Sequence, residues 1–232
     1  MRKPKIIIVG ADKGGVGKTT VTRILADYMT RKNVSARYYD TEFPGGDLKR
    51  FIKSAEVLDI SKVTSQMEIF DVLDPESIII IDLRAALLTD ILEELKNAKL
   101  LEEVQNGNMS LVLLHILGPT INSLKEVISV GRQIGGGTRH LFVKNYINDS
   151  TFFEWDKDAD ATTLREMMAG STITVPELTP MAVEKIQKEG CTFIGFADDK
   201  NQSRILRGHV SSWVNKVFTE FDRVDIARRE DA

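Results

Sequence analysis

Residues 10–20 read Gly10-Ala11-Asp12-Lys13-Gly14-Gly15-Val16-Gly17-Lys18-Thr19-Thr20 and lie between two segments of different hydrophobic pattern. The preceding residues 6–9, Ile-Ile-Ile-Val, form a continuous apolar run, which is typical of a strand buried on both faces of a parallel sheet. Residues 19–31 place apolar side chains at helical spacing. Glycines in the intervening turn allow backbone N–H groups to converge on a phosphate at the positive end of the helix. The stretch therefore predicts a strand, a phosphate-binding loop and a helix, in that order.

The side chains of this loop fit the chemistry of a nucleotide. Lys18 supplies a positive charge for the β and γ phosphates, and the Thr19 hydroxyl can ligate Mg²⁺. The alternative is a glycine-rich turn that carries a lysine by chance, but it does not account for strand, loop, Lys-Thr pair and helix in the required order. The nucleotide-binding residues that this chemistry predicts in the loop are Gly14, Gly15, Val16, Gly17, Lys18, Thr19 and Thr20.

Two further apolar runs end in an aspartate. Residues 36–39 lead to Asp40, and residues 77–81, Ser-Ile-Ile-Ile-Ile, lead to Asp82. Ligands of open parallel sheets bind at the carboxyl ends of the strands, so both side chains are candidates for one site. A carboxylate in the position of Asp82 holds Mg²⁺, usually through a water. The alternative for each aspartate is a residue that caps a turn at the end of its strand.

Strand-like and helical patterns alternate along the rest of the chain. Residues 111–116, 140–143 and 172–175 are typical of strands, and residues 124–134, 180–189 and 202–221 of helices. This alternation predicts an α/β fold: a mostly parallel, doubly wound sheet with helices on both faces, in three layers. In the last helix we expect these side chains to face the core: Ile205, Leu206, Val210, Trp213, Val214, Val217 and Phe218.

The chain length favours one domain over residues 1–232, because 232 residues suffice for one sizeable core. Residues 149–170 are the least regular part, and they could form a lid or a partner surface. The alternative, which we favour, is a surface segment whose aromatic side chains Phe152, Phe153 and Trp155 are buried, because large aromatic groups usually are.

Composition excludes several classes of protein. The net charge is −3, so binding of nucleic acid requires a local basic patch. The single cysteine, Cys191, excludes a disulfide framework or a multi-thiolate metal site within the chain and fits a reducing cytosol. The first apolar run is too short for a signal peptide, and no apolar stretch is long enough to span a bilayer. We therefore expect a soluble, cytoplasmic protein.

Residues 13–20, Lys-Gly-Gly-Val-Gly-Lys-Thr-Thr, resemble the deviant Walker A box of the ParA/MinD family, whose ATPases position plasmids, chromosomes and division sites. The resemblance implies ATP or ADP and Mg²⁺ as cofactors, slow ATP hydrolysis, and a homodimer that forms when ATP binds. It implies that Lys13 reaches the ATP bound by the partner molecule. The alternative for Lys13 is a solvated loop lysine.

Three other segments resemble boxes of the same family. Residues 40–47 resemble a switch segment, with Glu42 in place of a more usual second aspartate, which implies that Asp40 orients the attacking water and touches the Mg²⁺ shell. Asn145 and Pro176 resemble residues that contact adenine, and the GTPase pattern Asn-Lys-x-Asp is absent from residues 144–149. The resemblance thus assigns catalysis to Lys13, Lys18 and Asp40, and the metal to Thr19, Asp40 and Asp82.

The segment after Asp82 departs from the family pattern. Leu83-Arg84-Ala85-Ala86 stands where small or proline residues sense the γ-phosphate. Arg84 contacts the nucleotide or a partner, or it is a solvated surface arginine, which is the interpretation that the sequence favours. The altered segment also suggests an alternative function, a nucleotide-binding adaptor with little hydrolysis.

The resemblance implies a role in plasmid or chromosome partition, positioning or plasmid maintenance, with a smaller likeness to TraL/StbB-like ATPases. Implied partners are a DNA-binding adaptor or activator protein and non-specific DNA, the latter through a patch of Lys200, Arg204, Arg207 and His209. A solvated helix face is the slightly favoured alternative for this patch. Acidic residues interrupt the basic ones in residues 222–231, so stable membrane anchoring is not expected. Residues 10–12 also faintly resemble dethiobiotin synthetase, so a metabolic ligase is a further alternative.

Overall fold

The computed structural model describes residues 2–11, 13–118, 134, 136–147, 152, 155, 157, 161–162, 166 and 171–229. In this part of the chain seven strands form one sheet, in the order β3-β2-β4-β1-β5-β6-β7, and every neighbouring pair is parallel. The strands are β1 (Lys5–Gly10), β2 (Ala36–Asp40), β3 (Glu56–Val57), β4 (Ile78–Asp82), β5 (Ser110–Leu117), β6 (Arg139–Asn145) and β7 (Ser171–Val175). The predicted parallel α/β sheet is confirmed.

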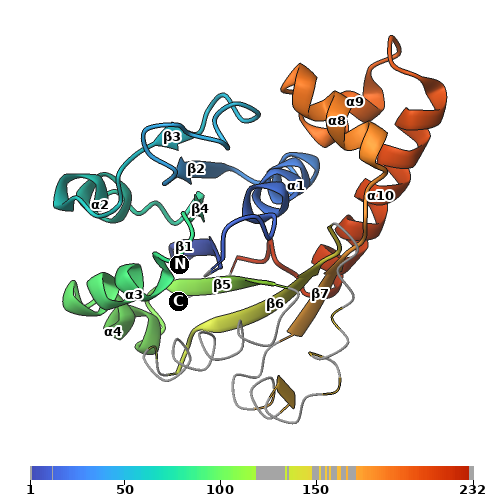
Figure 1. The fold of residues 1–232 in the computed structure, drawn as a ribbon. Helices are drawn as coiled ribbons and strands as arrows, with labels where there is room; N and C mark the ends of the chain where they lie inside the picture. The colour runs from blue at the N-terminus through green and yellow to red at the C-terminus, as the bar shows by residue number, and fades with distance from the viewer. Residues whose placement is uncertain are drawn as a thin grey trace.

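Helices cover both faces of this sheet (Figure 1). The described helices are α1 (Lys18–Arg31), α2 (Val63–Phe70), α3 (Leu88–Asn97), α4 (Leu100–Gln105), α8 (Pro180–Glu189), α9 (Phe193–Asp198) and α10 (Arg204–Arg223). Ile7 and Val9 of β1 pack in one apolar cluster with α1, α8, α9 and α10. Ile6 and Ile8 pack in a second cluster with α2, α3 and α4. Alternate side chains of one buried strand thus serve two cores, which explains its continuous apolar sequence.

The register of the central strands brings the polar strand ends together. Val9 of β1 lies opposite Asp82 of β4, and Asp82 in turn lies opposite Asp40 of β2. The chain leaves β1 one residue later, at Gly10, and enters the glycine-rich loop. The two aspartates and the loop therefore meet at one point of the carboxyl edge.

The predicted strands and helices that fall in the described residues are present, with shifts of one or two residues at their ends. The predicted helix over residues 124–134 lies outside them, apart from Ile134, and so does most of the 149–170 segment. Within that segment Phe152 and Trp155 are buried, as expected, whereas Phe153 lies outside the described residues. That residues 1–232 form a single domain stays a prediction.

One core assignment is wrong. Ile205 is 68% exposed, although we expected it in the core. It lies in the first turn of α10, and the first buried residue of that helix is Val210. Figure 1 shows this end of α10 extending past the sheet, next to α8 and α9, so no strand lies beneath the first turn. No helix in the described part of the chain has the length and apolarity needed to cross a bilayer.

Candidate functional site

The glycine-rich loop leads from β1 into the N-terminus of α1. Gly15 and Gly17 have φ angles of 77° and 88°, in the left-handed region that favours glycine. A methyl group added at Gly14 or Gly15 would meet no atom within 4 Å, so this part of the loop borders open space. Gly17 is the N-cap of α1, and no side chain caps the helix there. The end of the helix thus has the arrangement that accepts an anion.

A hollow of about 610 Å³ opens beside this loop. We call it the phosphate hollow. It is lined by Gly14, Gly15, Gly17, Lys18, Thr19, Thr20, Asp40, Glu42, Asp47, Asp82, Leu83, Arg84, Ala85, Ile147, Val183 and Gln187. Its volume lies in the range of small-molecule sites. The fold therefore brings together four residues that the sequence predicts for one site: Lys18, Thr19, Asp40 and Asp82.

Asp82 is a buried carboxylate that lines the phosphate hollow. The pKa of Asp82 is raised to about 7, mainly by burial and also by the charge of Asp40, while hydrogen bonds from Thr19 and Thr22 and the charge of Lys18 oppose the rise. The Thr22 hydroxyl donates to Asp82 Oδ1 over 3.0 Å. A carboxylate that lacks sufficient positive charge nearby is suited to a cation, because a bound cation favours its ionised form.

The donors present fit Mg²⁺. Thr19 and Asp82, one hydroxyl and one carboxylate, lie together, and this ion is usually held by one or two carboxylates, phosphates and waters. Among the residues that the structure describes, no cluster of three or more His, Cys, Asp or Glu side chains could hold a metal by itself. A Mg²⁺ ion held here would take its remaining ligands from waters and from the phosphates of a bound nucleotide.

Asp40 binds the backbone of the loop that follows β2. Of this contact the sequence indicated only that the residue could cap a turn. Its Oδ1 accepts a hydrogen bond from the Glu42 N–H over 3.0 Å, and its Oδ2 accepts from the N–H groups of Leu48 and Lys49 over 2.6 and 3.2 Å. The buried side chain thus holds the loop that follows β2. Its predicted contributions to water positioning and to the metal shell stay predictions.

Thr41 joins the loop after β2 to the loop after β4. Its N–H and its hydroxyl both donate to the carbonyl oxygen of Asp82, over 3.1 and 3.2 Å. The same hydroxyl oxygen accepts a hydrogen bond from the Arg84 N–H over 2.7 Å. The two loops are therefore fixed to each other through their backbones at the rim of the phosphate hollow.

A second hollow, of about 300 Å³, adjoins the phosphate hollow at Thr20 of α1. We call it the base hollow. It is lined by Thr20, Arg23, Asn145, Tyr146, Ile147, Pro176, Glu177, Leu178, Pro180, Val183, Glu184, Ile186, Gln187, Phe193 and Trp213. Asn145 and Pro176, the two residues predicted to contact adenine, both line it. Thr20, Ile147, Val183 and Gln187 line both hollows, so the two are neighbours.

Asn145 connects the base hollow to the glycine-rich loop. It is buried at the end of β6, and its Nδ2 donates to the carbonyl oxygen of Val16 over 3.0 Å. A methyl group at Gly17 would lie 2.2 Å from the same Nδ2. Pro176 is also held, because Trp213 Nε1 donates to its carbonyl oxygen over 2.6 Å. The loop and the two residues predicted for the base are therefore positioned by direct contacts.

Arg23 is a residue of this site that the sequence analysis missed. Its buried guanidinium lies over the rings of Phe51, at 3.4 Å, and Phe193, at 4.5 Å, and donates to the Cys191 carbonyl over 3.2 Å. Burial lowers the pKa of Arg23 to about 10, against the opposing charge of Asp27. An arginine on an amphipathic helix is normally solvated, and its aromatic partners come from distant segments. The only local signal was its position one turn after Thr19 and Thr20.

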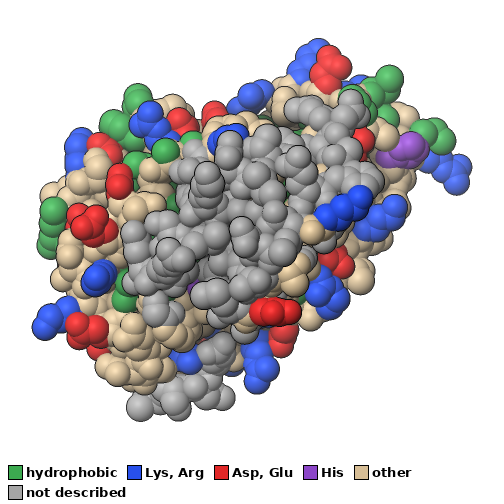
Figure 2. Space-filling model, turned by 60° about the horizontal axis from the view of Figure 1, so that its bottom comes forward, with side chains coloured by type: hydrophobic (Ala, Val, Ile, Leu, Met, Phe, Trp, Pro, Cys, Tyr) green, Lys and Arg blue, Asp and Glu red, His purple; other side chains and the backbone are tan. Residues whose placement is uncertain are grey.

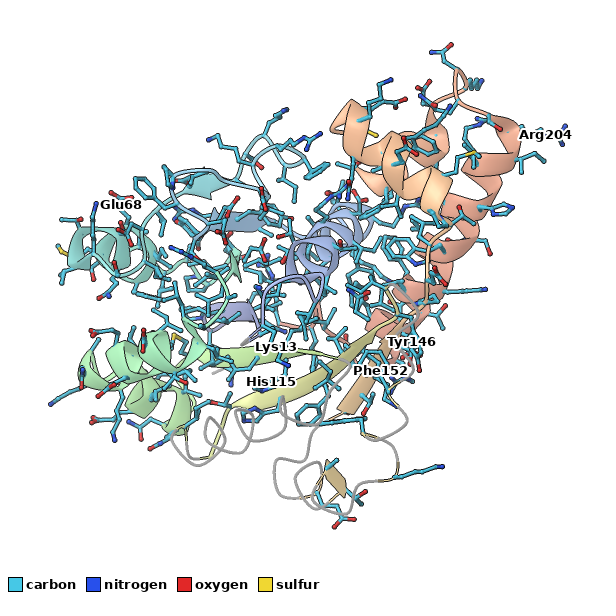
Figure 3. The ribbon with its side chains drawn as sticks, in the orientation of Figure 1. Lys13, Glu68, His115, Tyr146, Phe152 and Arg204 are labelled. Carbon is cyan, nitrogen blue, oxygen red and sulfur yellow. The ribbon has the colours of Figure 1, made fainter. Side chains whose placement is uncertain are left out.

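The remaining predicted residues lie on the surface. Lys13 is exposed, and its predicted action on a neighbouring molecule stays a prediction. Of the predicted DNA patch, Lys200, Arg204 and His209 are exposed and Arg207 is half-buried. Figure 3 shows Arg204 at the outer end of α10. In Figure 2 Lys and Arg side chains and a histidine lie together at one end of the visible face.

The parallel sheet and the glycine loop before α1 define an α/β protein of the P-loop class. No family model matches the chain. It is 20% identical over 191 residues to the protein MobD of Acidithiobacillus ferrooxidans, covering 78% of this chain and 81% of MobD. Among solved structures it resembles the septum site-determining protein MinD of Pyrococcus horikoshii in complex with Mg-ADP, with a TM-score of 0.55, 15% identity, and 97% and 98% of the two chains covered.

A ParA family ATPase of Chlorobium tepidum is also similar, with a TM-score of 0.50, 12% identity, and 91% and 98% of the two chains covered. The chain therefore has the fold of the MinD and ParA proteins. This outcome agrees with the three-layer architecture that the alternation of strand and helix patterns predicted.

Proposed function

We propose that this protein binds Mg-ATP in the two hollows, dimerises around it and hydrolyses it slowly, as a member of the ParA/MinD ATPases. One observation carries the proposal: the phosphate hollow combines the open glycine loop, the uncapped start of α1, Lys18, Thr19 and the buried Asp82. Backbone N–H groups and a lysine neutralise phosphate charge, and the hydroxyl and carboxylate hold the metal. The bound Mg²⁺ would neutralise charge on the β and γ phosphates.

The described residues have separate roles in this proposal. Lys18 binds phosphate, Thr19 and Asp82 support the metal, and Asn145 and Pro176 border the adenine. Lys13, exposed on the loop, completes the site of the second molecule. Asp40 positions the attacking water while it holds the loop after β2. ATP then drives dimerisation only to the extent that the dimer binds it more tightly than the monomer does.

We further propose a role in partition, positioning or maintenance of a plasmid or chromosome. The MinD and ParA folds support this role, and so does the likeness to MobD over most of both chains. The basic patch of Lys200, Arg204, Arg207 and His209 at the start of α10 would give salt-sensitive contacts with DNA phosphates, and an adaptor or activator protein would stimulate hydrolysis.

Equilibrium binding of Mg-ATP and Mg-ADP tests the nucleotide site. The wild-type protein should bind both nucleotides, and Lys18→Ala should lose most of the affinity, by about 100-fold or more, because it removes the only lysine that lines the phosphate hollow in the described residues. Lys96→Ala, an exposed lysine on α3, is the matched control. Undiminished ATP affinity of Lys18→Ala would refute the assignment.

Light scattering with Mg-ADP and Mg-ATP tests the switch. We expect the wild-type protein to dimerise with Mg-ATP but not with Mg-ADP, and we expect Lys13→Ala to bind ATP as a monomer. Because Asp40 also holds a loop, Asp40→Asn is a better test of hydrolysis than Asp40→Ala, since the amide oxygen keeps one acceptor. It should trap the ATP dimer, and unchanged turnover would remove Asp40 from the mechanism. Tight binding without turnover in the wild type would instead identify a nucleotide-binding adaptor.

A further inference from the structure

Arg84 lies at the rim of the phosphate hollow on a fixed backbone. Its N–H donates to the Thr41 hydroxyl over 2.7 Å, and the neighbouring Leu83 N–H donates to the Val9 carbonyl of β1 over 3.0 Å. The side chain itself is 56% exposed and lines the hollow. The guanidinium can therefore move while its attachment point stays in place.

Glu42 forms an ion pair with Arg84 across this rim. Arg84 Nε lies 3.8 Å from Glu42 Oε1, and both side chains are about half exposed. The Thr41 hydroxyl accepts a hydrogen bond from the Arg84 N–H, and Thr41 directly precedes Glu42. The backbones that carry the Arg84 and Glu42 side chains are therefore linked to each other. An exposed pair of this length contributes little free energy, because water screens it and both side chains lose freedom.

The charges that line the phosphate hollow are unbalanced. Among the described lining residues, four are carboxylates, Asp40, Glu42, Asp47 and Asp82, and only Lys18 and Arg84 are cations. A triphosphate adds further negative charge at this place. Guanidinium groups bind phosphate oxygens through two parallel hydrogen bonds, which are stronger than a single long contact with an exposed carboxylate. A γ-phosphate is therefore the better partner for Arg84 than Glu42 is.

We propose that Arg84 is a γ-phosphate ligand that Glu42 holds in the nucleotide-free protein, an inference that rests on the proposed ATP site. When Mg-ATP binds, the guanidinium exchanges Glu42 for the γ-phosphate, and the Glu42 carboxylate is released at the rim. Mg-ADP lacks the γ-phosphate and leaves the ion pair intact. The Arg84–Glu42 pair thus distinguishes ATP from ADP by a change of partner.

Equilibrium binding of fluorescent Mg-ADP and of a non-hydrolysable Mg-ATP analogue, AMPPNP, tests this exchange. Arg84→Ala should weaken AMPPNP binding by about 10- to 100-fold, as expected for a lost hydrogen bond between charged groups, and should change ADP binding by less than about 2-fold. Arg84→Lys should keep part of the AMPPNP affinity. Glu42→Gln should strengthen AMPPNP binding a few-fold at low salt, because it removes the competing partner, and should leave ADP binding unchanged.

Arg37→Ala is the matched control. Arg37 and Glu56 form an ion pair of nearly equal length, 3.7 Å, with similar exposure, and neither residue lines the phosphate hollow. This control should leave both affinities unchanged. The proposal is overturned if Arg84→Ala affects ADP and AMPPNP equally or neither, if Arg37→Ala has the same effect, or if Glu42→Gln weakens AMPPNP binding. If the wild-type protein binds neither nucleotide, the ATP site itself is refuted. This outcome is seen without any variant, so it is distinct from failure of the Arg84 proposal, in which the wild type binds both nucleotides.

Discussion

The phosphate hollow and the base hollow share four lining residues but differ in how they are built. The phosphate hollow is lined by one short run of the chain within residues 14–20, by the ends and following loops of β2 and β4, and by Ile147, Val183 and Gln187. The base hollow takes its walls from α1, the ends of β6 and β7, and α8 to α10, which are far apart in the sequence. Its polar groups are also positioned by residues distant in the sequence, because Trp213 Nε1 donates a hydrogen bond to the Pro176 carbonyl oxygen. The first hollow thus contains one continuous run that the sequence alone can mark, whereas the second depends on tertiary packing throughout.

The largest expected effect is at Gly17, which lines the phosphate hollow and lies against Asn145 of the base hollow. Gly17→Ala places a methyl group 2.2 Å from Asn145 Nδ2, at a φ of 88° that side chains rarely adopt. We expect a loss of roughly 2–5 kcal/mol in the free energy of unfolding, from the left-handed conformation and the steric overlap together. Urea denaturation measures it.

Gly14→Ala is the control for Gly17, because a methyl group at Gly14 meets no atom within 4 Å. It should change the free energy of unfolding by less than about 0.5 kcal/mol. Adding Asn145→Ala to Gly17→Ala should recover part of the lost stability, since it removes the Asn145 amide that overlaps with the added methyl group. Equal destabilisation by Gly17→Ala and Gly14→Ala would show that any side chain added to the loop lowers stability, whether or not it contacts Asn145.

The next largest effect concerns pH and Asp82. The pKa of Asp82 is about 7 in the folded protein, above its ordinary value of 3.8, so the folded state binds the proton more tightly than the unfolded state. The contribution of Asp82 to stability is therefore greatest at low pH and falls as the pH rises from about 4 to about 7. The total change is roughly 4 kcal/mol at most, at about 1.4 kcal/mol per pKa unit. Asp82→Asn should remove it, so the variant should gain stability over the wild type in this range.

The difference between variant and wild type is the quantity to measure, because other groups titrate in the same range. Burial lowers the pKa of His115 to about 3 and of His140 to about 4, from 6.5, so these two residues destabilise the fold as the pH falls. Asp71→Asn, at an exposed aspartate, is the control. Mg-ATP should suppress the pH dependence that Asp82 gives the wild-type protein, since the metal favours the ionised carboxylate. A difference that does not vary with pH would contradict the raised pKa.

The contrast between the hollows also explains what the sequence could predict. Residues 6–20 carry strand, loop and helix signals that depend on consecutive residues, and the aspartates after two apolar runs mark the edge of the sheet. The bonds of Asp40 to the N–H groups of Leu48 and Lys49 depend on the course of a loop, which no periodicity records. The burial of Arg23 depends on Phe51 and Phe193, which lie far from it in the chain.

The missed elements follow the same logic. β3 has two residues and α4 and α9 have six each, too few for a period to be recognised. In α2 only Ser65 and Ile69 are buried, while Val63 and Met67 are exposed, so its apolar pattern does not mark the core face. Packing on the sheet, more than local propensity, stabilises these short helices.

A smaller effect is expected when the amide of Asn145 is altered. Asn145→Asp keeps the shape but replaces the Nδ2 donor with an oxygen that faces the Val16 carbonyl oxygen. Losing this buried hydrogen bond should cost about 1–3 kcal/mol of folding free energy and weaken ATP binding. Asn215→Asp, an exposed position on α10, introduces the same charge and should have little effect. Equal losses in both variants would mean that net charge, not the contact with the loop, is responsible.

The smallest expected effect separates the two hollows by ligand. Trp213→Phe removes the hydrogen bond to the Pro176 carbonyl but retains an aromatic ring against Phe193, whose centroid lies 4.8 Å from that of Trp213. The lost bond is worth about 1 kcal/mol, so ATP should bind about 5-fold more weakly. Tripolyphosphate carries the phosphates without the base, and its affinity should not change, because Trp213 lines the base hollow only. Calorimetric titration with both ligands measures the difference, and an equal loss for ATP and tripolyphosphate would show that the hollows do not bind base and phosphates separately.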